Sequence, residues 1–353
     1  MALRVGVLRG VCDDPRMATL QPADPALFFK GRPGDPRLGD LAVSGPVTPA
    51  ESDDGRPTVA LLGIADDRGI TNGGGRAGAA LGPRELRRWL YKMTLGGEEE
   101  LANLRLFDLG DAGPGDGLVR DDRGTVAEVH EQAERAAEEA LRAGAIIVLL
   151  GGGHDGAYAS QSAVLAAQDD REKRLWAINV DAHLDVRPLK DGQTITSGTP
   201  FRRLWERWGD RFGVTEFGLQ MQHNAAAHLE WARLRGWPAL ELRKLREEAE
   251  GKGPPKLRFY KQLTVAAGQG DLLSVSLDLD AVEAGSAPGV SAPCPDGFSP
   301  GDLLAFARIA GGHSAVKLLD VMECAPPLDE GGRTARLGAA AVWSFLAGVC
   351  GDR

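Results

Sequence analysis

The amino-acid sequence predicts an α/β protein built on a mainly parallel β-sheet. From Thr58 onward, short apolar runs alternate with longer amphipathic segments, which is the pattern of strands and helices in such a sheet. The amphipathic segments are also long enough to serve as the crossover connections that parallel strands require. Both observations favour a layered arrangement in which helices cover the faces of one sheet.

The apolar runs predict eight strands, and the segments between them include four clear helices. The predicted strands are Thr58 to Leu62, Leu104 to Leu109, Ala145 to Leu150, Leu175 to Val180, Gly213 to Gly218, Trp237 to Leu242, Leu272 to Leu279 and Ala315 to Met322. The predicted helices are Pro83 to Met93, Thr125 to Ala143, Gly156 to Ala167 and Ser299 to Ile309.

The N-terminal residues differ in composition from the rest of the chain. From about Asp13 to Arg56 the sequence is dense in proline, glycine and aspartate, with little apolar periodicity. We therefore predict an N-terminal arm over residues 1–56, extended or looped, that could lie across the core. Residues 57–353 are predicted to form a single domain.

Composition narrows the class of protein. With 43% hydrophobic and 26% charged residues, the chain has the make-up of a soluble globular protein. A net charge of -9 argues against a nucleic-acid partner. The first residues have no apolar stretch of the length expected for a signal peptide, no other run approaches the length of a membrane span, and the four cysteines are scattered. These features predict a cytoplasmic protein with reduced thiols and no membrane partner.

A glycine-rich segment, NGGGRAGAALG at 72–82, raises the question of nucleotide binding. Glycines of this kind let backbone N–H groups approach a phosphate. The segment lacks the lysine and serine of a Walker loop and the spacing of a dinucleotide-binding loop. We predict instead a loop that turns into a helix, with Pro83 in the first turn.

Three polar clusters follow three apolar strands. They read GGGHD at 151–155, DAHLD at 181–185 and DLD at 278–280. In an open parallel sheet the loops at the carboxyl ends of the strands converge on one crevice. The clusters are therefore predicted to meet, and the candidate ligands of a metal pair are His154, Asp181, His183, Asp185, Asp278 and Asp280.

The charge of these clusters points to bound cations. Four carboxylates in a partly buried space repel one another unless cations neutralise them, and two divalent ions with this set sum to zero charge. Oxygen ligands with a few imidazoles and no thiolate suit Mn²⁺, with Fe²⁺, Co²⁺, Ni²⁺ and Zn²⁺ as other choices. Two such ions, about 3.5 to 4 Å apart, lower the pKa of a shared water and so favour hydrolysis.

Each cluster also has a simpler interpretation. GGGHD could be a strand-to-helix turn in which His154 or Asp155 caps the helix, and DAHLD could be a polar loop with a capping aspartate. DLD could be a pair of carboxylates solvated at a strand end. Three such coincidences at one edge of one sheet favour the metal site.

These motifs, in this order and with this wide spacing, resemble the arginase or ureohydrolase superfamily. The resemblance runs from about Val59 to Leu346 and implies a three-layer α/β/α fold with a parallel sheet of eight strands and two Mn²⁺ ions. It assigns one ion to His154, Asp181, Asp185 and Asp278, and the other to Asp181, His183, Asp278 and Asp280. It also implies a homo-oligomer, since relatives commonly form trimers or hexamers.

Outside the ligand set, the sequence is most similar to the members that release formamide and L-glutamate from N-formimidoyl-L-glutamate. Arg187, in DVRP, could clamp a substrate carboxylate. Ser197 stands near the place of a histidine that arginases and agmatinases carry. The segments NGGGRAGAALGP and RTAR at 333–336 also look like those of formimidoylglutamases, which makes Asn72 and Arg76 further substrate candidates.

Glu323, in MECAPPLDE, resembles the superfamily glutamate that holds the cationic head of the substrate. The resemblance therefore implies a catalytic role for Glu323, with a small amidine amino acid as substrate. The proton for the leaving nitrogen could come from Asp185, the other catalytic candidate, or from the water that bridges the metals. Three simpler roles remain open: ion pairing for Arg187, turn stabilisation for Asn72 and Arg76, and helix capping for Glu323.

Two other functions remain open from the sequence. The chain could act on agmatine, arginine or another guanidino compound and release urea. It could also be a metal-binding scaffold without turnover, although the complete ligand set speaks against that.

Overall fold

The structure, a computed structural model, describes residues 20–48, 55–97, 99–113, 125–247 and 253–351. Nine parallel strands form one sheet with the order β1-β3-β2-β4-β9-β8-β5-β6-β7. The strands are β1 Ala42–Ser44, β2 Thr58–Ile64, β3 Arg105–Ala112, β4 Ile146–Leu150, β5 Leu175–Val180, β6 Phe212–Leu219, β7 Ala239–Glu241, β8 Leu272–Asp278 and β9 Val316–Met322.

The predicted α/β class and parallel sheet are confirmed, and all eight predicted strands are present. The ninth strand, β1, comes from the predicted N-terminal arm and pairs with β3. Gln21 also bridges to Asp111 at the end of β3, so part of the arm lies along this edge of the sheet. Residues 1–19 and 49–54 of the predicted arm lie outside the described residues, and the division at residue 56 stays a prediction.

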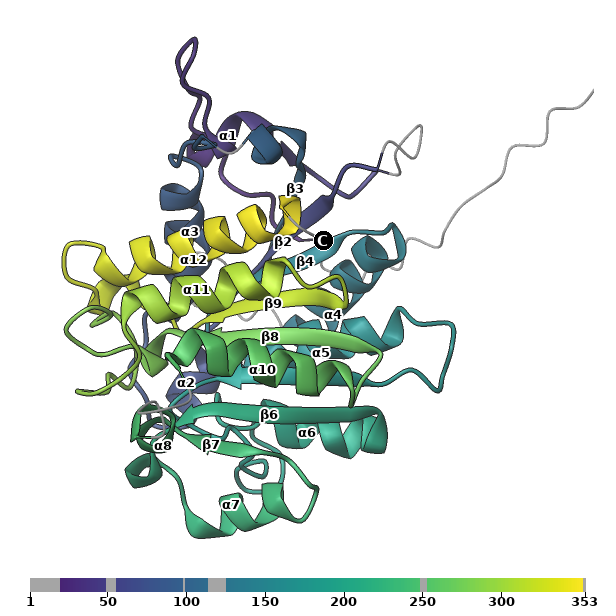
Figure 1. The fold of residues 1–353 in the computed structure, drawn as a ribbon, viewed down its shortest axis with the longest axis vertical. Helices are drawn as coiled ribbons and strands as arrows, with labels where there is room; N and C mark the ends of the chain where they lie inside the picture. The colour runs from purple at the N-terminus through teal and green to yellow at the C-terminus, as the bar shows by residue number, and fades with distance from the viewer. Residues whose placement is uncertain (1–19, 49–54, 98, 114–124, 248–252, 352–353) are drawn as a thin grey trace, which may run out of the picture.

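Helices cover both faces of the sheet, as Figure 1 shows. On one face α12 packs against α3 and α11, and α11 packs against α10; on the other face α4 packs against α5, and α5 against α6. The helices are α1 Leu38–Leu41, α2 Arg68–Asn72, α3 Gly82–Leu90, α4 Val126–Arg142, α5 Ala157–Ala166, α6 Pro200–Trp208, α7 Ala226–Arg233, α8 Leu242–Glu247, α10 Pro255–Ala267, α11 Pro300–Gly311 and α12 Arg333–Cys350.

The four predicted helices correspond to α3, α4, α5 and α11, and their ends follow local sequence signals. Thr125 and Glu128 form a capping box at the start of α4, and Ser299 and Asp302 form one at the start of α11. Pro83 lies in the first turn of α3, as predicted. The side chains of the two capping boxes accept hydrogen bonds from N–H groups that have no partner within the first helical turn.

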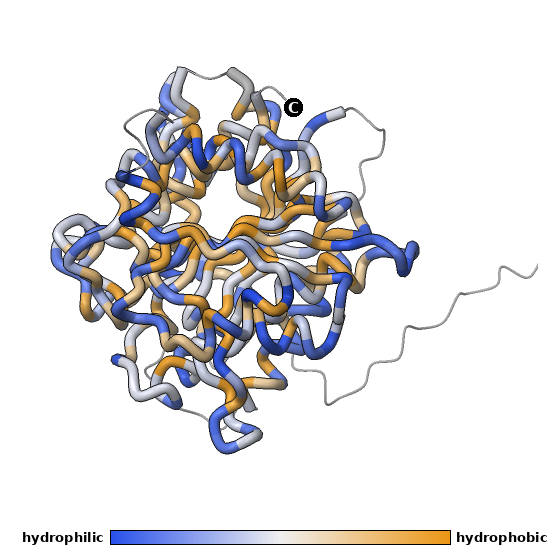
Figure 2. Tube along the Cα trace, turned by 60° about the horizontal axis from the view of Figure 1, so that its bottom comes forward, coloured by the Kyte–Doolittle hydropathy of each residue, from blue (hydrophilic) through white to orange (hydrophobic). Residues whose placement is uncertain are grey.

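Because helices cover both faces, the inner strands are buried along their whole length and consist mainly of apolar residues. Every residue of β2, β4, β5, β6 and β8 is buried. Figure 2 shows the hydrophobic residues concentrated in the sheet and the hydrophilic residues in the outer turns. This burial on both faces is typical of parallel sheets.

Arg87 joins α3 to β3 through a fully buried ion pair. Its Nε and Nη2 atoms lie 2.8 and 2.9 Å from the two carboxylate oxygens of Asp108, and its Nη1 lies 2.6 Å from Asp111 Oδ1. The hydroxyl of Tyr91 also donates to Asp108. These bonds fix the outer helix to the sheet.

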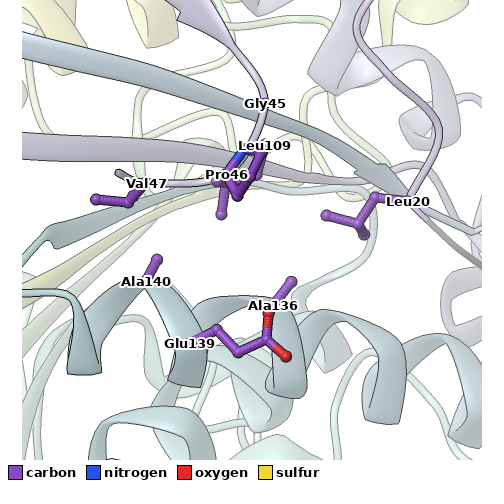
Figure 3. Close-up of a pocket in the computed structure, with 8 residues that line it drawn as sticks. All are labelled: Leu20, Gly45, Pro46, Val47, Leu109, Ala136, Glu139 and Ala140. Atoms are coloured by element: carbon purple, nitrogen blue, oxygen red, sulfur yellow. The ribbon is translucent and has the colours of Figure 1, made fainter. Parts of the chain in front are cut away.

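An apolar cavity of about 290 Å³ lies between the N-terminal segment, β3 and α4 (Figure 3). Leu20, Val47 and Leu109 line one side of it, and Ala136, Glu139 and Ala140 of α4 line the other. None of its lining residues belongs to the three polar clusters.

Of the cysteines within the described residues, Cys294 and Cys324 are buried free thiols. No helix in the described segments combines the length and apolar character needed to cross a bilayer.

Candidate metal centre

The three polar clusters meet at the carboxyl ends of four neighbouring strands. His154 follows β4, Asp181 follows β5, and Asp278 is the last residue of β8. Glu323 follows β9, which lies between β4 and β8. The strands β8 and β9 thus fill the gap between β4 and β5, and their ends complete the site at the centre of the sheet.

The imidazole of His154 faces three carboxylates. Its Nδ1 atom lies 2.9 Å from Asp278 Oδ2 and 3.2 Å from both Asp181 Oδ2 and Asp185 Oδ2. One ligand atom from each of these four residues falls within 4.8 Å of the others, a spacing that could hold a metal ion. The same four residues form the first ligand set that the family resemblance implies.

A second group lies beside the first and shares Asp181 with it. His183 Nδ1 lies 3.3 Å from Asp181 Oδ1 and 3.2 Å from Asp280 Oδ2, and these three residues could also hold an ion. Asp278 is not within this second group. Its Oδ1 instead accepts a hydrogen bond of 2.7 Å from the backbone N–H of Asp280.

The electrostatics of this cluster call for positive charge. Burial and neighbouring carboxylates raise the pKa of Asp278 and of Glu323 well above their usual values. Burial also raises the pKa of Asp280 to about 7. The imidazoles supply part of the positive charge that the carboxylates need. Burial by itself lowers the pKa of His154, but hydrogen bonds to Asp181, Asp185 and Asp278 raise that pKa well above its usual value.

Among the described residues, Asp280 Oδ1 is buried and has no hydrogen-bond partner. A buried carboxylate oxygen without a donor is costly, and a cation would satisfy it. With four carboxylates and two imidazoles in contact, the donor set fits a pair of hard divalent cations.

The backbone is strained at two residues of the site. Asp185 has a φ of 49° and Glu323 a φ of 67°, and these are two of the three residues other than glycine with positive φ in the described chain. Such a conformation costs about 1–3 kcal/mol for a non-glycine residue, and it persists where the surrounding structure enforces it. Strain of this kind is often found at functional sites.

A cavity of about 150 Å³ opens onto the cluster. It is lined by Ile70, Gly73, Gly75, His183, Asp185, Arg187, Thr196, Ser197, Gly198, Asp278, Asp280, Ser291, Ala292 and Glu323. Most of the predicted metal, catalytic and substrate residues therefore line one cavity. His154 and Asp181 do not line it, but His154 contacts Asp185 and Asp278, which do, and Asp181 contacts His183, which also does. Asn72 and Arg76 are not among its lining residues.

Arg187 lies at the exposed side of this cavity. Its backbone N–H donates to the carbonyl of Gly198, and its side chain packs over that glycine. No described residue accepts a hydrogen bond from its guanidinium. The group is therefore open to an anionic partner.

Glu323 lies deeper in the cavity. It is 4% exposed, and its Oε1 accepts a hydrogen bond of 3.0 Å from the backbone N–H of His154. Ser197 lines the cavity, and its backbone N–H donates to the carbonyl of Gly69.

The side chains of Asn72 and Arg76 donate hydrogen bonds to backbone carbonyls of neighbouring loops. The Asn72 amide donates to the carbonyl of Ile195 at 3.0 Å. Arg76 donates to the carbonyls of Ser291 and Val290 at 2.9 and 2.7 Å. Both residues hold the loops that line the cavity, and their predicted contact with substrate stays a prediction.

Two buried polar groups near the cluster were not among the predicted site residues. His130 Nε2 lies 3.0 Å from Asp155 Oδ2, and Asp155 directly follows His154 in the sequence. Asn179 donates to Asp181 Oδ2 and to Glu216 Oε2, at 3.2 and 2.9 Å. His130 lies far from the motifs in sequence, whereas Asn179 and Glu216 carry a usable signal because they are polar residues inside buried strands.

The chain is similar to known proteins over most of its length. A family model described as the arginase family matches residues 57–348. The formimidoylglutamase of Aromatoleum aromaticum is 37% identical over 294 residues, which cover 81% of this chain and 82% of that protein. The formimidoylglutamase of Geobacillus thermodenitrificans is 32% identical over 306 residues, 86% of this chain and 87% of that protein.

Among solved structures, a Trypanosoma cruzi formiminoglutamase with Mn²⁺ superposes with a TM-score of 0.74 at 29% identity. The match covers 90% of this chain and 100% of that one. The extent of the family match and the identity to these relatives show that the chain belongs to the arginase family.

Proposed function

We propose that this chain is a dinuclear manganese hydrolase that cleaves N-formimidoyl-L-glutamate with water to L-glutamate and formamide. The two relatives above are formimidoylglutamases, and the structural relative carries Mn²⁺. One observation carries the proposal for this chain: an open guanidinium, that of Arg187, shares a cavity with the carboxylate–imidazole cluster. The proposed metal ligands are His154, Asp181, His183, Asp185, Asp278 and Asp280.

When bound, a pair of divalent cations lowers the pKa of water toward neutrality and polarises an amidine carbon. The protein has to hold the substrate over that water. Glu323 is placed to orient the cationic formimidoyl head, because its carboxylate is buried at the wall of the cavity. Arg187, at the exposed side, is placed to bind a glutamate carboxylate through two parallel hydrogen bonds.

Hydrolysis breaks the bond between the formimidoyl carbon and the glutamate nitrogen, and that nitrogen must gain a proton. We assign this transfer to Asp185, which lines the cavity, as the group that takes a proton from water and returns it to the leaving nitrogen. Ser197, which lies in the same wall, offers a hydroxyl for hydrogen bonding to the substrate.

The test is a product assay on the Mn²⁺-loaded protein. Stoichiometric formamide and glutamate from N-formimidoyl-L-glutamate support the proposal. Urea from agmatine or arginine, with no turnover of the formimidoyl compound, would establish a guanidino hydrolase instead. Metal binding without turnover of formimidoyl, ureido or guanidino substrates would establish a non-catalytic scaffold.

The proposal extends to a cytoplasmic location and to a homo-oligomer, a trimer or hexamer as is common in the family. Sedimentation at equilibrium measures the oligomer directly, and a monomeric mass would overturn that part.

A further inference from the structure

A buried chain of hydrogen bonds leads from His154 away from the cavity. His154 Nε2 lies 2.9 Å from Ser276 Oγ, on β8. Ser276 stands opposite Asp320 of β9 in the parallel register, and its hydroxyl, as a donor beside the Asp320 carboxylate, lowers the pKa of that carboxyl. Ser276 and Asp320 are both fully buried. The chain thus links one edge of the metal cluster to a carboxylate inside the sheet.

Two side chains of α5 also donate hydrogen bonds to the Asp320 carboxylate. Ser160 Oγ donates to Asp320 Oδ1 at 2.9 Å, and Gln161 Nε2 donates to Asp320 Oδ2 at 3.4 Å. No described lysine or arginine pairs with Asp320. Burial raises the pKa of Asp320 to about 7, and its hydrogen bonds oppose this rise. An acid buried without a cation destabilises a fold, which suggests that it serves another purpose here.

The direction of the chain follows from the position of His154. Its Nδ1 faces three carboxylates and must be free of a proton to bind a cation there. Nε2 then carries the proton and donates it to Ser276 Oγ. The hydroxyl of Ser276 is then left to donate to the ionised carboxylate of Asp320. With a cation on Nδ1, each donor in the chain therefore has one acceptor.

We propose that Ser276 and Asp320 are positioning residues that fix the tautomer and orientation of His154 for metal binding. This inference rests on the proposed function, since it requires His154 to be a ligand. Partners of this kind behind a metal-binding histidine typically change metal affinity about 10- to 100-fold. The effect should fall on the one site that His154 serves, because His183 holds the other.

The test compares two buried serines. Ser276→Ala removes the acceptor of His154 Nε2–H. The control, Ser162→Ala on α5, removes an equally buried hydroxyl that accepts from Trp208 Nε1 and has no hydrogen bond to His154 or Asp320. Mn²⁺ affinity and stoichiometry are measured for the full-length protein, with electron paramagnetic resonance to distinguish coupled pairs from isolated ions. Thermal unfolding of the metal-free variants reports any general loss of packing.

We expect wild type and Ser162→Ala to bind two Mn²⁺ per chain with equal affinity. In Ser276→Ala one site should weaken about 10- to 100-fold, so that isolated ions appear at concentrations that give coupled pairs in wild type. Asp320→Asn should weaken the same site, because the amide is a poorer acceptor. Equal effects of the two serine variants, or none, would overturn the inference.

The outcomes also separate this inference from the proposed function. If wild type takes up two Mn²⁺ and Ser276→Ala retains both at unchanged affinity, only the positioning role fails. If wild type takes up no Mn²⁺, the proposed metal centre fails and the positioning role fails with it. If Ser276→Ala weakens one site and Asp320→Asn does not, the role of Asp320 is refuted.

Discussion

The carboxylate of Glu323 accepts a hydrogen bond from the backbone N–H of His154, so the ends of β9 and β4 are joined within the site. We expect Glu323→Gln to retain this bond through its amide oxygen and to keep its full metal content. Loss of the negative charge should lower kcat/KM about 10²- to 10³-fold, as for other groups aimed at charge in a transition state. Steady-state kinetics and metal analysis of the same sample check this prediction.

The control for this change is Glu330→Gln, an exposed glutamate that pairs with Arg333 and does not line the cavity. Unchanged kinetics in Glu323→Gln would remove Glu323 from the proposed mechanism. Loss of metal would place it in the metal centre instead.

Arg187 should determine the affinity for the substrate carboxylate. A hydrogen bond to a charged group contributes about 1.5–3 kcal/mol, so Arg187→Ala should raise KM for N-formimidoyl-L-glutamate about 10- to 100-fold without loss of metal. A formimidoyl amine that lacks carboxylates should be hydrolysed equally by both proteins. Arg233→Ala, which changes an exposed arginine outside the cavity, is the matched control. Equal losses on both substrates would contradict the carboxylate role.

The metal-free protein should lose stability as the pH rises. Burial raises the pKa of Asp280 and of Asp320 from an ordinary value of 3.8 to about 7, so the folded protein binds more protons than the unfolded chain between these values. The free energy of unfolding therefore falls as pH increases through this window. Melting temperatures in a chelator should be lower at about pH 8 than at about pH 5.

Added Mn²⁺ should reduce or reverse this trend, because metal binding requires deprotonated ligands and stabilises the folded state. A metal-free protein that becomes more stable over the same pH range would show that these carboxylates are ionised without metal.

The buried Arg87 should be important for stability rather than for chemistry. Arg87→Met leaves the Asp108 carboxylate buried without its partner, which should cost about 3–5 kcal/mol. Arg87→Met with Asp108→Leu should recover part of that loss. Arg88→Met is the control, because Arg88 makes an exposed pair with Glu85 and should change stability by about 0.5 kcal/mol or less. Denaturant midpoints of the metal-free proteins measure all three, and equal effects of the two single variants would refute the prediction.

Much of the fold could be predicted because the spacing of apolar residues marks the strands and helices, and their alternation along the chain indicates a parallel sheet. The inner strands are buried on both faces and so appear in the sequence as continuous apolar runs. The strand β1 could not be predicted in this way. Its three residues, of which two are exposed, lie among prolines and glycines, and they become a strand only because β3 offers them a partner.

The centre of the site was predictable for the same reason as the strands. His154, Asp181 and Asp278 follow or end apolar runs, and parallel strands bring such ends together. Contacts that depend on side-chain direction were not predictable. Nothing in the glycine-rich loop indicates that Asn72 and Arg76 bind backbone carbonyls of other loops.

The inner polar residues did leave a signal. Ser276 interrupts the apolar run LLSVSLD, and Asp320 interrupts KLLDVM. A polar residue inside a strand with both faces buried needs a partner, so its presence points to a hydrogen-bond network. What the sequence lacks is the register that sets these two side chains opposite each other.

The strand order has a consequence for synthesis of the chain. The middle of the sheet is made last: β8 and β9 emerge from the ribosome after β4 and β5, yet they lie between them. Strand β5 lacks a neighbour on its inner side until residue 278 has been translated, and β4 lacks one until residue 322. A nascent chain that ends before β8 therefore carries two open strand edges, and it cannot yet bring together the two halves of the metal centre.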